Sequence, residues 1–291
     1  MEFKNTLKQK SEEIEILLKE YMPKEEGYQK TIMEAMNYSL CAGGKRLRPA
    51  LMMQFAKALG CESESVLDFA CAIEMIHTYS LIHDDLPCMD NDDIRRGKPS
   101  CHIAFGEDIA LLAGDSLLTA AFEIASESKV LPQKAISCIG EIAKTAGMCG
   151  MCAGQCLDLE SENRQITADE LKEIHKGKTV AMIKICAKIP CIIADADENT
   201  TSECLKYCEE IGLAFQIQDD ILDVIGDEEK LGKPINSDGE NKKNTYVSFY
   251  GLDKCKLMVE KMTANAINCV SKIDDDGRLK ALAEYLAKRD Y

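Results

Sequence analysis

The sequence is organised around residues 77–100, which read HTYSLIHDDLPCMDNDDIRRGKPS. Within thirteen positions this stretch holds five aspartates and two adjacent arginines: Asp84, Asp85, Asp90, Asp92, Asp93, Arg95 and Arg96. Carboxylates this close repel one another, so a folded protein tolerates the cluster where divalent cations neutralise it. Mg²⁺ is the usual cation when phosphate oxygens complete the ligand shell, and guanidinium groups suit a diphosphate. The alternative for this stretch alone is a solvated acidic loop with helix-capping aspartates.

A second acidic cluster lies in residues 215–223, which read FQIQDDILD. Asp219 and Asp223 are at positions i and i+4, so an α-helix presents both on one face about one turn apart. Asp220 lies at the edge of that face. The residues around the three aspartates are apolar, which predicts a buried helix with one acidic face.

The first cluster can present its aspartates on one side, as the second does, only if its helix is broken. Asp84 and Asp90 can face in one direction only if the helix ends or unwinds at Pro87. Two acidic helix faces then predict a cage for several metal ions, with a polyanion between them. The pairing of the two clusters is far more specific than either cluster alone.

With both clusters in place, the chain resembles the short-chain trans-prenyl diphosphate synthases, of the bacterial farnesyl diphosphate synthase type. The matching motifs run in order along most of the chain: GGKRLRP at 43–49, DDLPCMD at 84–90, RR at 95–96, GQCLD at 154–158, KT at 178–179, Gln216, DDILD at 219–223, GK at 232–233 and Lys243. The first aspartate motif has two residues more than the plain Asp-Asp-x-x-Asp form, as in the bacterial and plant-type enzymes. Many members have Gly after the Lys-Thr pair, whereas this chain has Gly177 before it and Val180 after it. The sequence therefore does not decide whether the helix breaks at this point.

The resemblance implies a fold and a reaction. The fold is all-α, a single domain over residues 1–291, forming a helical bundle of the isoprenoid synthase type around a deep central cavity. The reaction is the head-to-tail condensation of isopentenyl diphosphate with dimethylallyl or geranyl diphosphate, which gives farnesyl diphosphate. Three Mg²⁺ ions per active site would assist ionisation of the allylic diphosphate. The family also implies a homodimer.

The resemblance assigns roles to matching positions of this chain. The metal ligands would be Asp84, Asp85, Asp90, Asp219 and Asp223. The diphosphate of isopentenyl diphosphate would be bound by Gly44, Lys45, Arg48, His77 and Arg96. The allylic diphosphate would be bound by Arg95, Lys178, Lys233 and Lys243. The Thr179 hydroxyl and the Gln216 carbonyl are dipoles that would stabilise the allylic cation.

Product length is expected to depend on Tyr79 and Ser80, just before the first aspartate motif. Tyr79 precedes Asp84 by five residues, about 7.5 Å along a helix. An aromatic ring there would fill the shaft into which a longer prenyl tail grows, and the related geranylgeranyl synthases tend to have a smaller residue. The sequence therefore predicts the fifteen-carbon product.

Composition limits the other classes of function. The chain has 291 residues, 46% of them hydrophobic, and its net charge of −15 argues against nucleic acid or an anionic membrane as partner. The 15 cysteines are an odd number, and the amino terminus MEFKN lacks an apolar signal region. We therefore expect a cytoplasmic protein with free thiols. No run approaches the roughly twenty apolar residues of a membrane span.

Periodic apolar residues and breakers predict a series of helices: 2–21, 27–41, 50–60, 64–83, 105–126, 130–159, 167–190, one through 211–225, and two in 251–288. The polar segment 226–245 is expected to form a flap over the allylic diphosphate.

Two local patterns have competing interpretations. Cys149, Cys152 and Cys156 could bind iron–sulfur or zinc, but no fourth ligand is near, and packing of small residues on one helix face is favoured. The Cys204–Cys208 pair has the same explanation. The Gly-Lys-Thr triplet at 177–179 lacks the upstream glycine and strand of a P-loop, so nucleotide binding is rejected.

Other functions remain as alternatives. A geranylgeranyl diphosphate synthase would use the same chemistry. A class I terpene cyclase normally has a different second metal motif, and DDILD at 219–223 argues against it. A non-catalytic subunit or a Ca²⁺-binding helical scaffold is the alternative from another class, but inactive homologues usually lose an aspartate, and both clusters here are complete.

Overall fold

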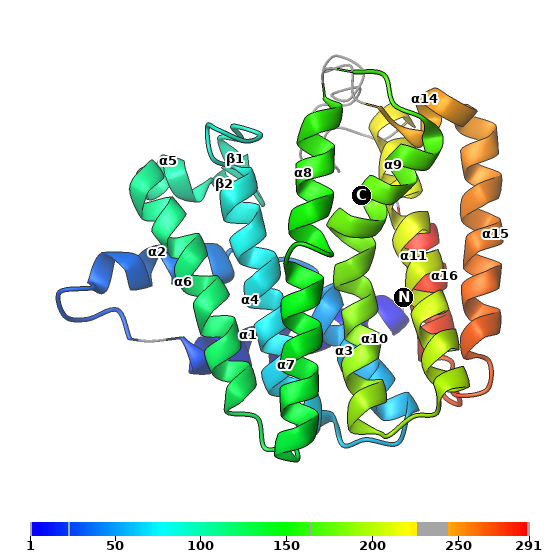
Figure 1. Ribbon diagram of the computed structural model, residues 1–291, viewed down its shortest axis with the longest axis horizontal. Helices are drawn as coiled ribbons and strands as arrows, with labels where there is room; N and C mark the ends of the chain where they lie inside the picture. The colour runs from blue at the N-terminus through cyan, green and yellow to red at the C-terminus, as the bar shows by residue number, and fades with distance from the viewer. Residues whose placement is uncertain (1, 23, 163, 226–243, 290–291) are drawn as a thin grey trace. The chain divides into compact units, whose positions relative to one another are not determined.

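The computed structural model describes residues 2–22, 24–162, 164–225 and 244–289, and the regular secondary structure of these residues is helical apart from one short two-stranded hairpin (Figure 1). The predicted all-α class is confirmed. The chain forms two compact units, one of Met1–Met53 and Glu62–Ile139, the other of Gln54–Cys61 and Gly140–Tyr291. The first aspartate motif belongs to unit 1 and the second to unit 2.

Unit 1 is built on α4 (Leu67–Asp84), which packs against α6 (Glu107–Ser126) (Figure 1). Eleven of the 18 residues of α4 are buried, as expected for a helix that is apolar on all sides. The other elements are α1 (Glu2–Tyr21), α2 (Lys30–Leu40), η1 (Ser63–Val66), β1 (Ile94–Arg95), β2 (Lys98–Pro99) and α5 (Cys101–Phe105). Two helices contribute residues to both units: α3 (Leu47–Ala58) and α7 (Pro132–Ala146).

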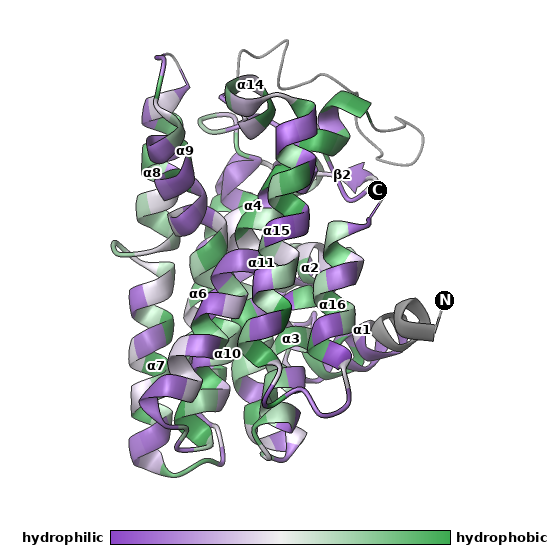
Figure 2. Ribbon diagram, turned by 90° about the vertical axis from the view of Figure 1, so that its right-hand side faces the viewer, coloured by the Kyte–Doolittle hydropathy of each residue, from purple (hydrophilic) through white to green (hydrophobic). Residues whose placement is uncertain are grey.

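Unit 2 is built on α11 (Glu198–Ile225), which packs against α15 (Leu252–Val270) and α10 (Ala181–Ile193). The other elements are α8 (Met151–Ser161), α9 (Ala168–His175), the π-helical turn η2 (Lys176–Val180), α14 (Tyr246–Tyr250) and α16 (Arg278–Ala287). In Figure 2 both hydrophilic and hydrophobic residues lie along α15 and α16, as in helices with one solvent-facing side.

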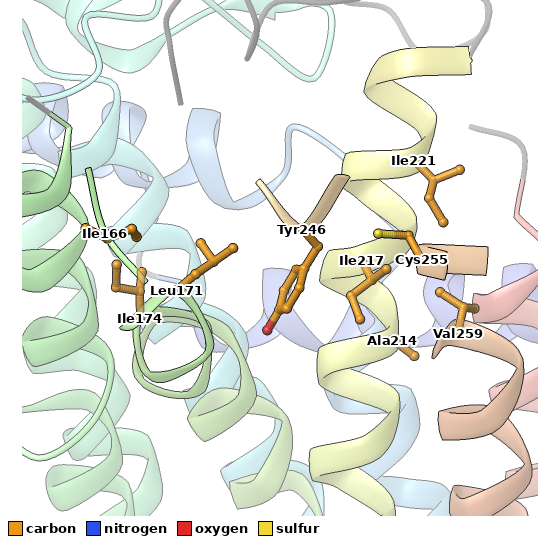
Figure 3. Close-up of a cluster of buried hydrophobic side chains, with 9 residues drawn as sticks. All are labelled: Ile166, Leu171, Ile174, Ala214, Ile217, Ile221, Tyr246, Cys255 and Val259. Carbon is orange, nitrogen blue, oxygen red and sulfur yellow. The ribbon is translucent and has the colours of Figure 1, made fainter. Parts of the chain in front are cut away.

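A cluster of nine buried side chains fixes the rotation of α11 in unit 2 (Figure 3). Its members come from α11, α14, α15 and the region of α9: Ile166, Leu171, Ile174, Ala214, Ile217, Ile221, Tyr246, Cys255 and Val259. Ile217 and Ile221 are 0% and 2% exposed; Ile217 precedes the second aspartate motif by two residues, and Ile221 lies within it. Burial of this apolar face therefore decides where the three aspartates of α11 lie. A capping box also stabilises the start of α9, where the Thr167 hydroxyl accepts the Glu170 N–H.

The structure divides two helices that the sequence predicted as continuous. The predicted helix 105–126 is interrupted at Gly106, whose φ of +94° separates α5 from α6. The predicted helix 130–159 is interrupted at residues 147–150, between α7 and α8. A Cβ on Gly150 would lie 1.9 Å from the Thr145 carbonyl oxygen, so the turn between α7 and α8 requires glycine there.

A short hairpin replaces the loop expected after the first aspartate motif. β1 and β2 pair antiparallel, with Ile94 opposite Pro99 and Arg95 opposite Lys98. The two turn residues, Arg96 and Gly97, have φ values of +53° and +75°. Two successive positive φ values are typical of the tight turns that match the twist of a hairpin.

Two described helices have the length and hydropathy of a membrane span, so the expectation that no run approaches this length was wrong. They are Ser63–Asp84 and Glu107–Ser126, and 67% and 39% of their apolar windows are buried within the protein. Buried core helices of soluble proteins meet the same criteria, and α4 is such a core helix in unit 1.

Candidate active site

The first aspartate motif lies where α4 ends in unit 1. The helix ends at Asp84, before Pro87, as the sequence predicted. The chain then turns back, and the Asp90 N–H donates to the Asp84 carbonyl oxygen at 2.8 Å. Asp84 is half-buried and Asp90 exposed. The two ends of the motif therefore lie side by side at one helix terminus.

Asp85 faces an arginine. It is 2% exposed, and Arg95 Nε donates to its two carboxylate oxygens at 2.9 and 3.2 Å. Arg95 also pairs with Asp92 at 3.1 Å. Burial raises the pKa of Asp85, although the hydrogen bond and charge of Arg95 lower it. In this conformation Asp85 orients Arg95, whereas Asp84 and Asp90 are more open to a metal ion.

The hairpin turn places Arg96 against Gly43 and Gly44, the two glycines that begin the GGKRLRP motif at 43–49. Arg96 donates to the Gly43 carbonyl oxygen. A Cβ on Gly44, whose φ is +133°, would lie 2.9 Å from Arg96 Cζ. Gly44 therefore lets the guanidinium rest against the backbone beside Lys45, which is exposed.

His77 lies among the arginines of this region. Its pKa is lowered well below the ordinary value, first by burial and then by the positive charges of Arg48 and Arg96. A neutral imidazole among cations can donate a hydrogen bond to an anion without adding charge. Three of the predicted ligands for isopentenyl diphosphate are thus brought together within unit 1.

The three aspartates of α11 have different surroundings in unit 2. Asp220 is buried and accepts the Tyr246 N–H at 2.6 Å, so it fastens α14 to α11. The Asp219 side chain is 41% exposed and pairs with Arg289 at 2.5 Å. Asp223 is 3% exposed. The i, i+4 pair that the sequence predicted as metal ligands is therefore distinct from the structural Asp220.

The Lys178-Thr179 pair lies in the π-helical turn η2 between α9 and α10. The sequence did not decide whether the helix breaks beside the Lys-Thr pair, and the π-helical turn is such a break. Lys178 Nζ pairs with Asp158 at 2.7 Å, and the Thr179 hydroxyl donates to Gln216 Oε1 at 2.6 Å. The structure thus joins the Lys-Thr pair to two other predicted motifs of unit 2.

Gly154 allows α8 to approach the backbone of η2. A Cβ at this position would lie 2.1 Å from the Lys178 backbone nitrogen. Gly154→Ala should therefore destabilise the protein by about 2–4 kcal/mol and lower the activity, because Lys178 must move. Urea denaturation and the steady-state rate would measure the two effects.

Gly140→Ala is the matched control, since Gly140 is also in a helix and a Cβ there meets nothing within 4 Å. This change should stabilise α7 by about 0.5–1 kcal/mol. Equal stability of the two variants would contradict the requirement for close approach at Gly154.

The cysteine predictions have mixed outcomes. Cys149, Cys152 and Cys156 are exposed, and Cys149 precedes α8, so the explanation by helix packing was wrong for them. Cys204 and Cys208 are buried in α11, as the packing explanation requires. Nowhere in the described part of the chain do three His, Cys, Asp or Glu side chains gather closely enough to hold a metal ion by themselves.

Each unit offers carboxylates that suit Mg²⁺. Asp84 and Asp90 in unit 1, and Asp219 in unit 2, have side chains that are at least partly accessible, and Mg²⁺ is usually held by one or two carboxylates with waters and substrate phosphates. Such a site needs no preformed cluster of three protein ligands. Two predicted ligands of the allylic diphosphate, Lys233 and Lys243, lie outside the described residues.

Sequence reasoning missed two contacts of the site. The bond from Tyr246 to Asp220 and the pair of Arg289 with Asp219 join residues 26 and 70 positions apart. Neither Tyr246 nor Arg289 lies in a motif. The only available signal was that Asp220 falls at the edge of the acidic face.

Comparisons with known proteins cover nearly the whole chain. A family model described as polyprenyl synthetase matches residues 29–286. The farnesyl diphosphate synthase of Geobacillus stearothermophilus is 45% identical over 289 residues, which are 98% of this chain and 97% of that protein. The geranylgeranyl diphosphate synthase of Cyanophora paradoxa is 42% identical over 288 residues, 98% and 95% of the two chains. A solved structure of an FPP/GFPP synthase from Zymomonas mobilis has a TM-score of 0.88 at 34% identity, covering 98% and 99% of the two chains.

Proposed function

Because the chain belongs to the polyprenyl synthetase family, we propose that it condenses isopentenyl diphosphate with dimethylallyl or geranyl diphosphate to give farnesyl diphosphate. The enzyme is a prenyltransferase. The observation that carries the proposal is the bond between Asp90 N–H and the Asp84 carbonyl oxygen, which joins the ends of the first aspartate motif. The farnesyl diphosphate synthase relatives support the fifteen-carbon product.

Asp84, Asp90, Asp219 and Asp223 would hold Mg²⁺, with three ions per active site. Bound Mg²⁺ supplies Lewis-acid stabilisation of the diphosphate leaving group. Asp85 stays a candidate ligand, but its contact with Arg95 favours a role in orienting that guanidinium.

The chain's basic residues would divide between the two substrates. Lys45, Arg48, His77 and Arg96, with the backbone of Gly44, would bind isopentenyl diphosphate. Arg95 and Lys178 would stabilise the charge that develops on the allylic diphosphate, together with Lys233 and Lys243.

Two dipoles of unit 2 would face the allylic cation. The Thr179 proton is donated to Gln216, so the lone pairs of the hydroxyl oxygen remain available to a positive charge. Neither group is a strong nucleophile, so the cation is stabilised without being captured. By family resemblance, the released diphosphate takes the final proton.

The proposal also includes the domain organisation, oligomeric state, location and partners predicted from the sequence. Residues 1–291 would act as one catalytic domain around a deep central cavity. The single domain is supported by one family model, which matches residues 29–286 and so includes residues of both units. We also propose a homodimer located in the cytoplasm. The net charge of −15 argues against nucleic acid as a partner, and small diphosphates would be bound by the local basic residues against this overall negative charge.

Tyr79→Ala should lengthen the product. Tyr79 is 6% exposed on α4, and its ring lies 5.6 Å from that of His83, edge to face. Removing the ring would open the shaft below Asp84, so products of twenty or more carbons should appear by mass spectrometry. Tyr79→Phe keeps the ring and should keep the fifteen-carbon product. An unchanged product length in Tyr79→Ala would exclude Tyr79 as the residue that limits product length. Its neighbour Ser80 would then be the next position to test.

The proposed reaction is tested by supplying Mg²⁺, labelled isopentenyl diphosphate and either dimethylallyl or geranyl diphosphate. A dominant fifteen-carbon product from both starters is expected. A twenty-carbon product would favour the geranylgeranyl synthase alternative, which relatives such as the Cyanophora paradoxa protein support. No condensation with any starter would favour a non-catalytic subunit.

A further inference from the structure

Arg289 lies against the second aspartate motif, two residues beyond the end of α16. Its side chain is 5% exposed, and Cζ lies 3.6 Å from the centre of the Phe215 ring. The terminal nitrogen donates to the Phe215 carbonyl oxygen at 2.8 Å and pairs with Asp219 at 2.5 Å. The Arg289 carbonyl oxygen accepts from Gln218 at 3.2 Å. One turn of α11 therefore holds both the side chain and the backbone of Arg289.

Burial of this guanidinium is costly, so the contacts that maintain it indicate a specific role. A buried charge is tolerated only where its partners compensate for lost water, and Nε of Arg289 is buried without a hydrogen-bond partner in the described part of the protein. The next residue toward the N-terminus, Lys288, is exposed. The chain thus buries one cation at the motif and leaves the adjacent cation in solvent.

The pair changes what Asp219 presents to a metal ion. A guanidinium 2.5 Å from a carboxylate oxygen neutralises the negative charge that attracts a divalent cation, and two cations at one carboxylate repel each other. The ring and carbonyl of Phe215 hold the guanidinium independently of Asp219. Arg289 can therefore release the carboxylate while it stays on α11.

We propose that Arg289 is a positioning residue that holds Asp219 until a metal–diphosphate complex displaces it, so that the metal binds this motif with the diphosphate rather than before it. The inference rests on the proposed function and concerns the order of binding. It does not alter the chemistry assigned to the aspartates.

The test is the affinity for Mn²⁺, measured by electron paramagnetic resonance of the free ion, with and without inorganic diphosphate. Arg289→Gln keeps a donor for the Phe215 carbonyl but removes the charge. This variant should bind Mn²⁺ about tenfold more tightly without diphosphate, and with diphosphate it should resemble the wild type. Arg289→Lys keeps the charge and should stay closer to the wild type. Lys288→Ala, the matched loss of a neighbouring charge, should change neither affinity.

An unchanged or weaker diphosphate-free affinity in Arg289→Gln would overturn the inference. If this variant does not fold, judged by its circular dichroism, Arg289→Ala and Arg289→Lys are compared in the same way. Failure of the proposed function would appear differently: the wild type would not bind Mn²⁺ with diphosphate, or Asp219→Asn would leave that binding unchanged.

Discussion

Asp84→Asn should lower kcat for condensation by about a thousandfold, the largest effect expected in this chain. The Asp84 carbonyl oxygen accepts the Asp90 N–H at 2.8 Å, and asparagine can keep this backbone bond and the shape of the helix end. The substitution removes the negative charge that would neutralise Mg²⁺ beside the leaving group. Steady-state kinetics with labelled isopentenyl diphosphate measure the loss, and unchanged thermal unfolding would show that the fold is intact.

Asp93→Asn is the matched control for this experiment. Asp93 belongs to the same acidic stretch and is exposed, and its backbone carbonyl, rather than its side chain, anchors the Ser100 N–H at 2.8 Å. We expect kcat within about threefold of the wild type, since exposed charges are screened. Comparable losses in both variants would mean that the stretch acts only through its total charge.

Arg46→Met should destabilise the protein by about 3–5 kcal/mol, because it leaves a buried carboxylate without its partner. Arg46 and Glu74 are each 2% exposed and pair at 2.8 Å. Arg46 also donates to the Leu40 carbonyl oxygen. Urea denaturation followed by circular dichroism measures the free energy of unfolding.

Two further variants separate the buried charge from general packing. The double variant Arg46→Met, Glu74→Met should recover most of the stability, because apolar residues of similar volume replace buried ion pairs well. Lys30→Met breaks an exposed pair with Glu34 and should cost under about 1 kcal/mol. A small loss in Arg46→Met would contradict the buried-pair argument. Because Arg46 lies between Lys45 and Arg48, the KM for isopentenyl diphosphate should rise even in the double variant.

Regular helices and motif spacing could be predicted because both depend on neighbours along the chain. The period of the apolar residues located the helices. The i, i+4 spacing of Asp219 and Asp223 distinguished these two predicted metal ligands from Asp220. Pro87 correctly indicated the end of α4. Each of these signals is local.

The partners of the site residues could not be predicted, since they are distant in sequence. Arg46 and Glu74 are 28 positions apart, and the bond between Tyr246 and Asp220 spans 26. No periodicity links such residues. The hairpin was missed because its turn uses Arg96 before Gly97, whereas Asn or Asp is the usual signal for two positive φ values.

The π-helical turn Lys176–Val180 acts as a single-residue insertion between two helices. The Ala181 N–H donates to the Lys176 carbonyl oxygen, one residue further back than in an α-helix. Loss of one residue here would rotate α9 relative to α10 by about 100°. Either Leu171 and Ile174 would leave the buried cluster, or Lys178 would leave Asp158. The length of this segment is therefore as constrained as its sequence, and insertions or deletions within it should be rarer than substitutions.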